Sequence, residues 1–364
     1  MNNWPTKKLG EVLEYEQPTK YLVSSTDYGD EYAIPVLTAG KSFVLGNTNE
    51  KNGIFPKEKL PVIIFDDFTT AIKFVDFPFK VKSSAMKILH AKKNEADIRF
   101  LFYKMLTIKF VHDQHKRYWI SECSNIKIPL PPLDIQKQIV ERLDKIVEAQ
   151  KLNDGLIQKT DELFQSLLHK ELNPAGKDWE VKKLSETGDI ITGTTPSTQN
   201  ADYWNGEFLW ATPTDIKKDT FVLTDTPKKL SHEGYEKTRP VPKNSILVTC
   251  IASIGKMAIA GKEMATNQQI NSIVCNKNSD PLFIFFSLQK DKKKLISLGK
   301  TTAVPIMNKS EFGRIKIFLP PLKIQKQIVA KLSAVQDYKK QLLEQKEKLK
   351  ELFDSALAKS MSNK

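Results

Sequence analysis

The chain has 364 residues, of which 40% are hydrophobic and 27% are charged, and this composition is typical of soluble globular proteins with more than one domain. A polar N-terminus without an apolar signal segment, and apolar runs too short to cross a bilayer, predict a cytoplasmic protein without membrane contact; three widely spaced cysteines argue against a disulfide scaffold or a zinc site. The formal net charge of +13 favours a polyanionic partner such as nucleic acid, although lysine-rich helices that only keep the protein soluble would give the same excess.

The first predicted element in chain order is a globular segment, residues 1–131. Apolar runs bounded by turn residues predict strands at 33–38, 61–65 and 85–89, and a helical pattern follows at 98–106. This order of elements indicates a mixed α/β domain.

A long helix is predicted next, over residues 132–172. Pro131 and Pro132 fix an extended approach, and the helical pattern then continues to the stop at Asn173 and Pro174. At 1.5 Å per residue, such a helix would be roughly 55 Å long.

The same layout then repeats, with a segment at 173–320 and a second long helix at 321–364. The string PLPPLDIQKQIV at 129–140 returns as LPPLKIQKQIV at 319–329, with a constant offset of 189 residues. Strands are predicted at 208–212, 245–250 and 271–275, with a helix at 281–288. The sequence therefore predicts a tandem duplication.

Both long helices carry an apolar stripe with a spacing near 3.5 residues, interrupted by polar residues in its middle, as in a coiled-coil seam with a restricted register. The predicted seam residues are Ile139, Leu143, Ile146, Ile157 and Phe164 on the first helix and Ile328, Leu332, Val335, Leu342, Leu349 and Phe353 on the second. One narrow stripe on each helix favours mutual pairing over packing of each helix on its own domain. An antiparallel pair would relate the two domains by a pseudo-twofold axis and suit a bipartite duplex target. The helices would then act as a ruler, because their length would set the length of the spacer between the two half-sites. The sequence does not exclude a parallel pair.

The doubled PPLxIQKQIV motif at the head of two long helices resembles the specificity (S) subunit of type I restriction–modification systems. The second segment adds matching strings at 193–197, 210–216 and 265–270, whereas the first segment matches less well. The resemblance implies two target-recognition domains separated by the central and C-terminal helices. Together with the pairing inferred from the apolar stripes and the duplication, this predicts an α+β fold in which two α/β target-recognition domains are joined by two long helices that pair as an antiparallel coiled coil.

The resemblance also implies a function. Each domain would read a short half-site in the major groove of double-stranded DNA, and the helices would dock two DNA methyltransferase (M) subunits, through which restriction (R) subunits join. The chain itself would bind no cofactor, and its partners would use S-adenosylmethionine, ATP and Mg²⁺.

Base reading requires side chains with donors and acceptors on loops or strand ends; Asn and Gln match adenine, and Lys matches guanine or phosphate. The candidate DNA-binding residues are Thr69, Thr70, Lys80, Lys82, Ser83 and Ser84 in the first segment and Thr212, Ser253, Lys256, Asn267, Gln268 and Gln269 in the second. For any one of them, a role in a turn is the alternative.

No catalytic or metal-binding constellation is predicted. Gly255-Lys256 lacks the upstream glycine of a phosphate-binding loop, and His112 and His115 lack a third metal ligand. Two alternatives stay open: a stand-alone DNA-modifying or DNA-cleaving enzyme that uses Asp66 or Asp67, and a coiled-coil adaptor without DNA affinity.

Overall fold

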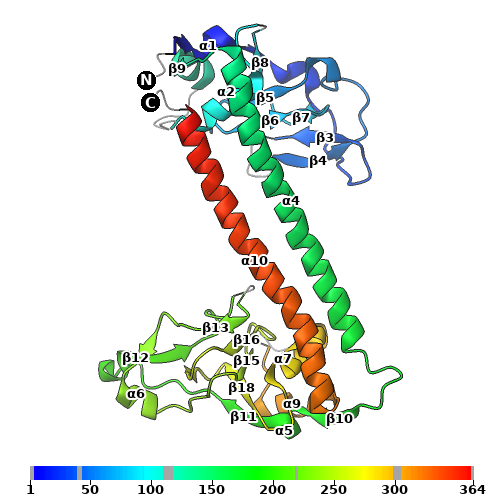
Figure 1. Ribbon diagram of the computed structural model, residues 1–364, viewed down its shortest axis with the longest axis vertical. Helices are drawn as coiled ribbons and strands as arrows, with labels where there is room; N and C mark the ends of the chain where they lie inside the picture. The colour runs from blue at the N-terminus through cyan, green and yellow to red at the C-terminus, as the bar shows by residue number, and fades with distance from the viewer. Residues whose placement is uncertain are drawn as a thin grey trace. The chain divides into compact units, whose positions relative to one another are not determined.

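The computed structural model describes residues 4–38, 43–92, 94–109, 118–217, 220–297 and 305–361. The chain divides into two compact units (Figure 1), and unit 1 comprises Met1–Gly155 and Leu343–Lys364, while unit 2 comprises Leu156–Leu342. Two long helices, α4 (Leu133–Glu171) and α10 (Leu322–Met361), contribute to both units. Each unit therefore combines one globular segment with the beginning of one long helix and the end of the other.

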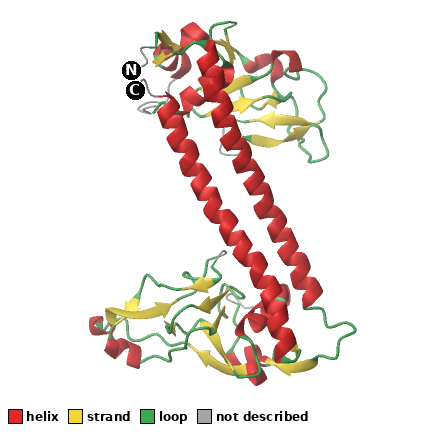
Figure 2. Ribbon diagram, in the orientation of Figure 1, coloured by secondary structure: helices red, strands yellow, loops and turns green. Residues whose placement is uncertain are grey.

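Unit 1 is built on a four-stranded antiparallel sheet with order β2-β8-β5-β6 and a three-stranded sheet with order β4-β3-β7, in which β3 and β7 are parallel. Figure 2 shows the strands of both units in yellow. A two-stranded ladder, β1-β9, joins the N-terminal segment to the approach of α4. The strands are β1 (Thr6–Lys8), β2 (Leu13–Glu16), β3 (Ile34–Leu37), β4 (Val44–Thr48), β5 (Val62–Asp66), β6 (Ile72–Val75), β7 (Lys80–Val81), β8 (Met86–Ala91) and β9 (Lys127–Pro129). The short helices are α1 (Leu9–Val12), α2 (Ile98–Leu106) and α3 (Tyr118–Ser121), and 3₁₀ turns lie at Pro18–Tyr21, Lys57–Lys59 and Cys123–Asn125.

Unit 2 repeats this frame with a five-stranded sheet, β11-β18-β15-β16-β13, a three-stranded sheet, β14-β12-β17, and a two-stranded ladder, β10-β19. The strands are β10 (Glu180–Lys183), β11 (Gly188–Thr192), β12 (Trp204–Ala211), β13 (Val222–Leu223), β14 (Lys229–Leu230), β15 (Ile246–Thr249), β16 (Met257–Ala260), β17 (Ala265–Thr266), β18 (Ile270–Cys275) and β19 (Lys316–Leu319). The helices are α5 (Leu184–Thr187), α6 (His232–Glu236), α7 (Pro281–Lys290), α8 (Lys292–Ser297) and α9 (Lys309–Gly313), and a 3₁₀ turn lies at Ala201–Tyr203. Every strand and helix predicted for the two segments is confirmed. Apart from the additional edge strand β13 in unit 2, the strand orders of the two units match, which confirms the duplication.

The entry into each domain is duplicated in detail. At the start of α1, the backbone N–H of Lys8 donates to Glu11 Oε2 at 2.7 Å, and at the start of α5 the N–H of Lys183 donates to Glu186 Oε2 at the same distance. Both bonds satisfy a helix-start donor that has no partner within the helix. This explains why a glutamate, Glu11 or Glu186, stands at the same place in both short helices.

The repeated glutamine of the IQKQIV motif joins each long helix to its domain. In unit 1, the side chain of Gln136 is fully buried; its Nε2 donates to Pro131 O at 2.7 Å and its Oε1 accepts from the N–H of Asp97 at 2.8 Å. Asp97 in turn caps α2, accepting from the N–H groups of Arg99 and Phe100. One amide thus connects the start of α4 to the start of α2.

Unit 2 contains the same arrangement around Gln325, which is also fully buried. Its Nε2 donates to Pro320 O at 2.8 Å and to Asn278 O at 3.0 Å, and its Oε1 accepts from the N–H of Asp280, the capping residue of α7, at 2.8 Å. Buried polar groups are stable only when they are hydrogen-bonded, so the repeated motif preserves a helix–domain joint.

The C-terminal end of each long helix is bound by a lysine from the short helix of the unit where it ends. Lys104 Nζ donates to Met361 O at the end of α10, and Lys290 Nζ donates to Leu172 O after the end of α4, both at 2.8 Å. A cation is favourable there because the last carbonyl groups of a helix lack intrahelical partners and carry partial negative charge. Burial lowers the pKa of Lys104.

The long helices run antiparallel within each unit, as predicted. In unit 1, Gln150 Nε2 donates to Leu349 O, and Asp154 lies 2.8 Å from Lys346 Nζ. In unit 2, Asp161 lies 2.6 Å from Lys339 Nζ. Such exposed ion pairs add little stability, but they favour one register.

All eleven predicted seam residues are buried or half-buried. Each domain core also includes residues from the end of the other half's helix. Leu357 and Met361 of α10 join the core of unit 1, and Phe164 and Leu168 of α4 join the core of unit 2. No helix in the described part of the chain is long and apolar enough to span a membrane.

Candidate nucleic-acid interface

One edge of unit 2 brings together the residues predicted to read DNA. Strands β12 and β17 are parallel, pairing Ala211 with Thr266, so their carboxyl ends meet at this edge. Thr212 follows the first strand and Asn267 follows the second, and the N–H of Asn267 donates to Ala211 O at 2.9 Å. The two predicted residues are therefore neighbours although 54 positions separate them in the chain.

The β15–β16 connection, residues 250–256, adds the remaining candidates to the same edge. The N–H of Cys250 donates to Gln269 O at 2.8 Å, and Lys256 Nζ lies 3.4 Å from Pro213 O in the turn after β12. Ser253, in the middle of this loop, is exposed. All six candidates of the second segment therefore gather at one edge, which we call the unit 2 edge.

In the glutamine turn at 267–269, some polar groups stabilise the turn and others are exposed. Asn267 is buried; its Nδ2 donates to Gln269 Oε1 at 3.0 Å and its Oδ1 accepts from the N–H of Gln269 at 3.1 Å. Gln268 is exposed and its Oε1 accepts from the hydroxyl group of Thr195. Asn267 thus holds the turn, and Gln268 is the member that solvent or a ligand reaches most easily.

The Gly193-Thr-Thr-Pro-Ser197 string lies against this turn. The N–H of Thr194 donates to Thr266 O at 2.8 Å, and a Cβ atom at Gly193 would lie only 2.2 Å from Asn267 O. Only glycine permits this close approach. The string therefore belongs to the same surface as the glutamines.

Unit 1 has a corresponding edge. Strands β3 and β7 are parallel, pairing Leu37 with Val81, and the N–H of Lys82 donates to Leu37 O at 2.8 Å. The β5–β6 turn lies beside the 82–85 turn because the N–H of Asp67 donates to Ala85 O at 3.1 Å. This unit 1 edge contains Thr69, Thr70, Lys82, Ser83 and Ser84.

Thr70 and Asn267 are buried, with exposed fractions of 6% and 7%, and Lys80 is the most deeply buried of the twelve candidates, at 3% exposed. Its ammonium group lies 2.7 Å from both Glu50 Oε2 and Asn52 O. The hydrogen bond from Lys80 is the main cause that lowers the pKa of Glu50. Lys80 therefore anchors the chain at 50–52, and contact with bases stays a prediction for the exposed members of the set.

The two acidic residues considered for a nuclease lie inside unit 1. Asp67 is 1% exposed, pairs with Lys87 at 3.4 Å, and accepts from the N–H of Trp119 at 2.8 Å. Asp66 accepts from groups of its own turn. Among the described residues no group of three or more His, Cys, Asp or Glu side chains could hold a metal ion, and His112 and His115 lie outside the described residues.

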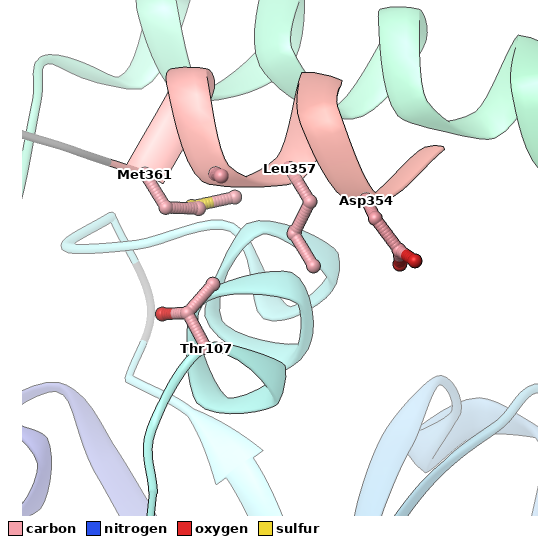
Figure 3. A pocket seen from close by; sticks show the side chains of 5 residues that line it. Thr107, Asp354, Leu357 and Met361 are labelled. Atoms are coloured by element: carbon pink, nitrogen blue, oxygen red, sulfur yellow. The ribbon is translucent and has the colours of Figure 1, made fainter. Parts of the chain in front are cut away.

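A recess of about 380 Å³ lies in unit 1 between the end of α2 and the last turns of α10 (Figure 3). Its lining residues are Thr107, Asp354, Leu357, Ala358 and Met361. Asp354 is the one titratable side chain among these described lining residues.

One exposed residue of the unit 1 edge was missed by the sequence analysis. Phe68, in the β5–β6 turn, is 47% exposed. The sequence feature that could have identified Phe68 is an aromatic residue in a polar turn, Asp66-Asp-Phe-Thr-Thr70, between two apolar strands.

Comparisons with known proteins agree with this architecture. The family model described as the type I restriction modification DNA specificity domain matches residues 1–160 and 176–352. The specificity subunit of the type I restriction enzyme EcoR124I/EcoR124II from Escherichia coli is 36% identical over 341 residues, covering 88% of this chain and 84% of that protein. The MjaVIII specificity subunit of Methanocaldococcus jannaschii is 28% identical over 319 residues, covering 78% of this chain and 72% of that protein.

Solved structures show the same fold. The S subunit of a type I restriction–modification system from M. genitalium aligns with 100% of this chain and 97% of that chain, with a TM-score of 0.65 at 14% identity. The HsdS subunit from Thermoanaerobacter tengcongensis aligns with 99% of this chain and 97% of that chain, with a TM-score of 0.51 at 19% identity. These likenesses confirm the predicted α+β fold.

Proposed function

The chain belongs to the type I restriction–modification DNA specificity family, and we propose that it reads a bipartite DNA target with one half-site for each unit. The observation that carries this proposal is the pair of corresponding edges. Each edge is formed where two parallel strands end, and both contain lysine, serine and threonine, but only the unit 2 edge adds the asparagine and glutamines of the 267–269 turn. Two readers on one frame with different polar groups fit two unlike half-sites.

The exposed faces of the long helices support docking of two methyltransferase subunits. Leu163 on α4 belongs to unit 2, and Leu352 on α10 belongs to unit 1; they occupy the same position of the repeat, 189 residues apart. Their exposed fractions are 51% and 52%. Equivalent exposed leucines in both units fit two copies of one partner, with restriction subunits joining through them.

We expect the chain alone to catalyse nothing, while its partners use S-adenosylmethionine, ATP and Mg²⁺. A stand-alone nuclease would require Asp66 and Asp67 to face a substrate, but both carboxylates are buried and bound to groups of unit 1. The adaptor alternative leaves unexplained why the candidate residues of each segment gather at one edge. A cytoplasmic location stays a prediction.

The proposal is tested by co-expression with a methyltransferase subunit of the same system in a methylation-free host, followed by single-molecule mapping of methyladenine. The expected result is a motif of two short, unlike half-sites around a fixed spacer. A continuous or palindromic motif would contradict independent reading by the two units. Absence of methylation, with both proteins soluble and associated, would favour the adaptor.

A further inference from the structure

Phe68 is presented on the unit 1 edge by a turn that is fixed at several points. A single exposed apolar side chain is common on protein surfaces and needs no explanation by itself. Here, however, Asp66 Oδ1 accepts from the N–H of Phe68 at 3.0 Å, and Asp66 Oδ2 accepts from the hydroxyl group of Thr69. The backbone of Asp66 also bonds to Thr70 N and Ala71 O, each at 2.9 Å. The aromatic ring is therefore carried by a preorganised support.

The turn also contains a strained residue. Thr70 has φ +56°, in the left-handed region that a β-branched residue rarely adopts. Such strain costs free energy and persists only where the surrounding structure enforces it, most often at functional sites. Asp67, in the same turn, is held by Lys87 and by the backbone N–H of Trp119.

The charge around Phe68 is suited to an anionic ligand. Both acidic residues of the turn are buried, with exposed fractions of 4% for Asp66 and 1% for Asp67. Lys73 on β6 and Lys82 after β7 are exposed. The surface that carries the ring is therefore free of the repulsion that two exposed carboxylates would exert on phosphate groups.

The corresponding loop of unit 2 has a different character. Between β15 and β16, residues 250–256 expose Ala252 and Ser253, while Ile254 is buried. An aromatic side chain at this place is thus a property of unit 1. A difference confined to one of two equivalent loops is expected of a residue that determines specificity, because residues that maintain the frame recur in both units.

Resting on the proposed function, we propose that Phe68 is a specificity-determining residue that contacts the C5-methyl group of a thymine in the half-site read by unit 1. That methyl group is the apolar feature of base edges in the major groove, and apolar side chains complement it. Because the backbone of the turn is already held, it loses little conformational entropy on binding, which favours affinity.

The test uses the full chain in complex with its methyltransferase partner and synthetic duplexes that contain the mapped target. Each thymine of the two half-sites is replaced in turn by uracil, which removes only the methyl group. The wild-type complex should lose about fourfold in affinity at one position, the value for burial of a single methyl-sized group. Phe68→Ala should bind both duplexes equally, and Phe68→Leu should retain part of the discrimination.

Phe318→Ala is the matched control, since Phe318 is 45% exposed on β19 of unit 2 and lies away from the unit 2 edge residues in the chain. It should discriminate thymine from uracil as the wild type does. Undiminished discrimination by Phe68→Ala, or a unit 1 half-site without a uracil-sensitive thymine, overturns this inference alone. A target that is not bipartite overturns the proposed function instead.

Discussion

Replacement of the buried motif glutamine should loosen the joint between each long helix and its domain. Gln325→Ala removes three hydrogen bonds and Gln136→Ala removes two, and both side chains are fully buried, so no water takes their place. At about 1 kcal/mol for each bond, the expected losses of stability are roughly 3 kcal/mol in unit 2 and roughly 2 kcal/mol in unit 1. The motif itself supplies matched controls, because Gln138 and Gln327 are exposed. Their replacement by alanine should change stability by less than about 0.5 kcal/mol.

Hydrogen exchange followed by mass spectrometry measures these effects unit by unit. In Gln325→Ala, exchange should accelerate in peptides that contain the start of α7, where the N–H of Asp280 loses its acceptor. In Gln136→Ala, it should accelerate at the start of α2, where Asp97 is the equivalent residue. The reasoning is refuted if the exposed glutamines have effects of the same size, or if each variant accelerates exchange equally in both units.

Three further predictions concern DNA recognition and the docking of methyltransferase subunits. Gln268→Ala combined with Gln269→Ala should weaken recognition of one half-site by about 1–3 kcal/mol per lost adenine contact and leave the other unchanged in methylation mapping; equal loss at both contradicts two readers. An insertion of four residues, about one helical turn, within 140–165 should lengthen the tolerated spacer between the half-sites. If the half-sites themselves changed, the helices would not set the spacer length. Leu163→Asp or Leu352→Asp should each reduce bound methyltransferase from two copies to one in native mass spectrometry, and unchanged stoichiometry argues against the proposed docking surface.

The architecture was predictable because it depends on repeated local signals. Two prolines followed by a long uninterrupted pattern determine where each long helix begins, and the apolar stripe determines which face is buried. The recurrence of one motif with a constant offset then requires the second half to repeat the first. Each of these signals can be recognised in one sequence, because none requires knowledge of contacts between residues that are distant in the chain.

The remaining elements depend on partners distant in the chain. Strand β1 (Thr6–Lys8) is exposed throughout and has no apolar alternation; it becomes a strand through pairing with β9. Lys80 resembles an exposed basic residue until Glu50 is found beside it. The place of Phe68 at the unit 1 edge could not be predicted either, because it depends on the fixed turn that carries this residue and on the neighbouring 82–85 turn.

The distribution of these residues separates stability from specificity. Groups that hold the frame recur in both units with the same partners, as Gln136 and Gln325 do with the capping residues of α2 and α7. Groups exposed at the two edges do not recur, since Phe68 and Gln268 have no equivalent in the other unit. The hydrogen bonds that recur in both units are buried at the starts of the long helices, whereas the variable side chains lie at strand ends. Substitution at an edge therefore leaves the hydrogen bonds of the frame intact. A new half-site can therefore be acquired by changing edge residues in one unit, without loss of the helix pairing or of the second reader.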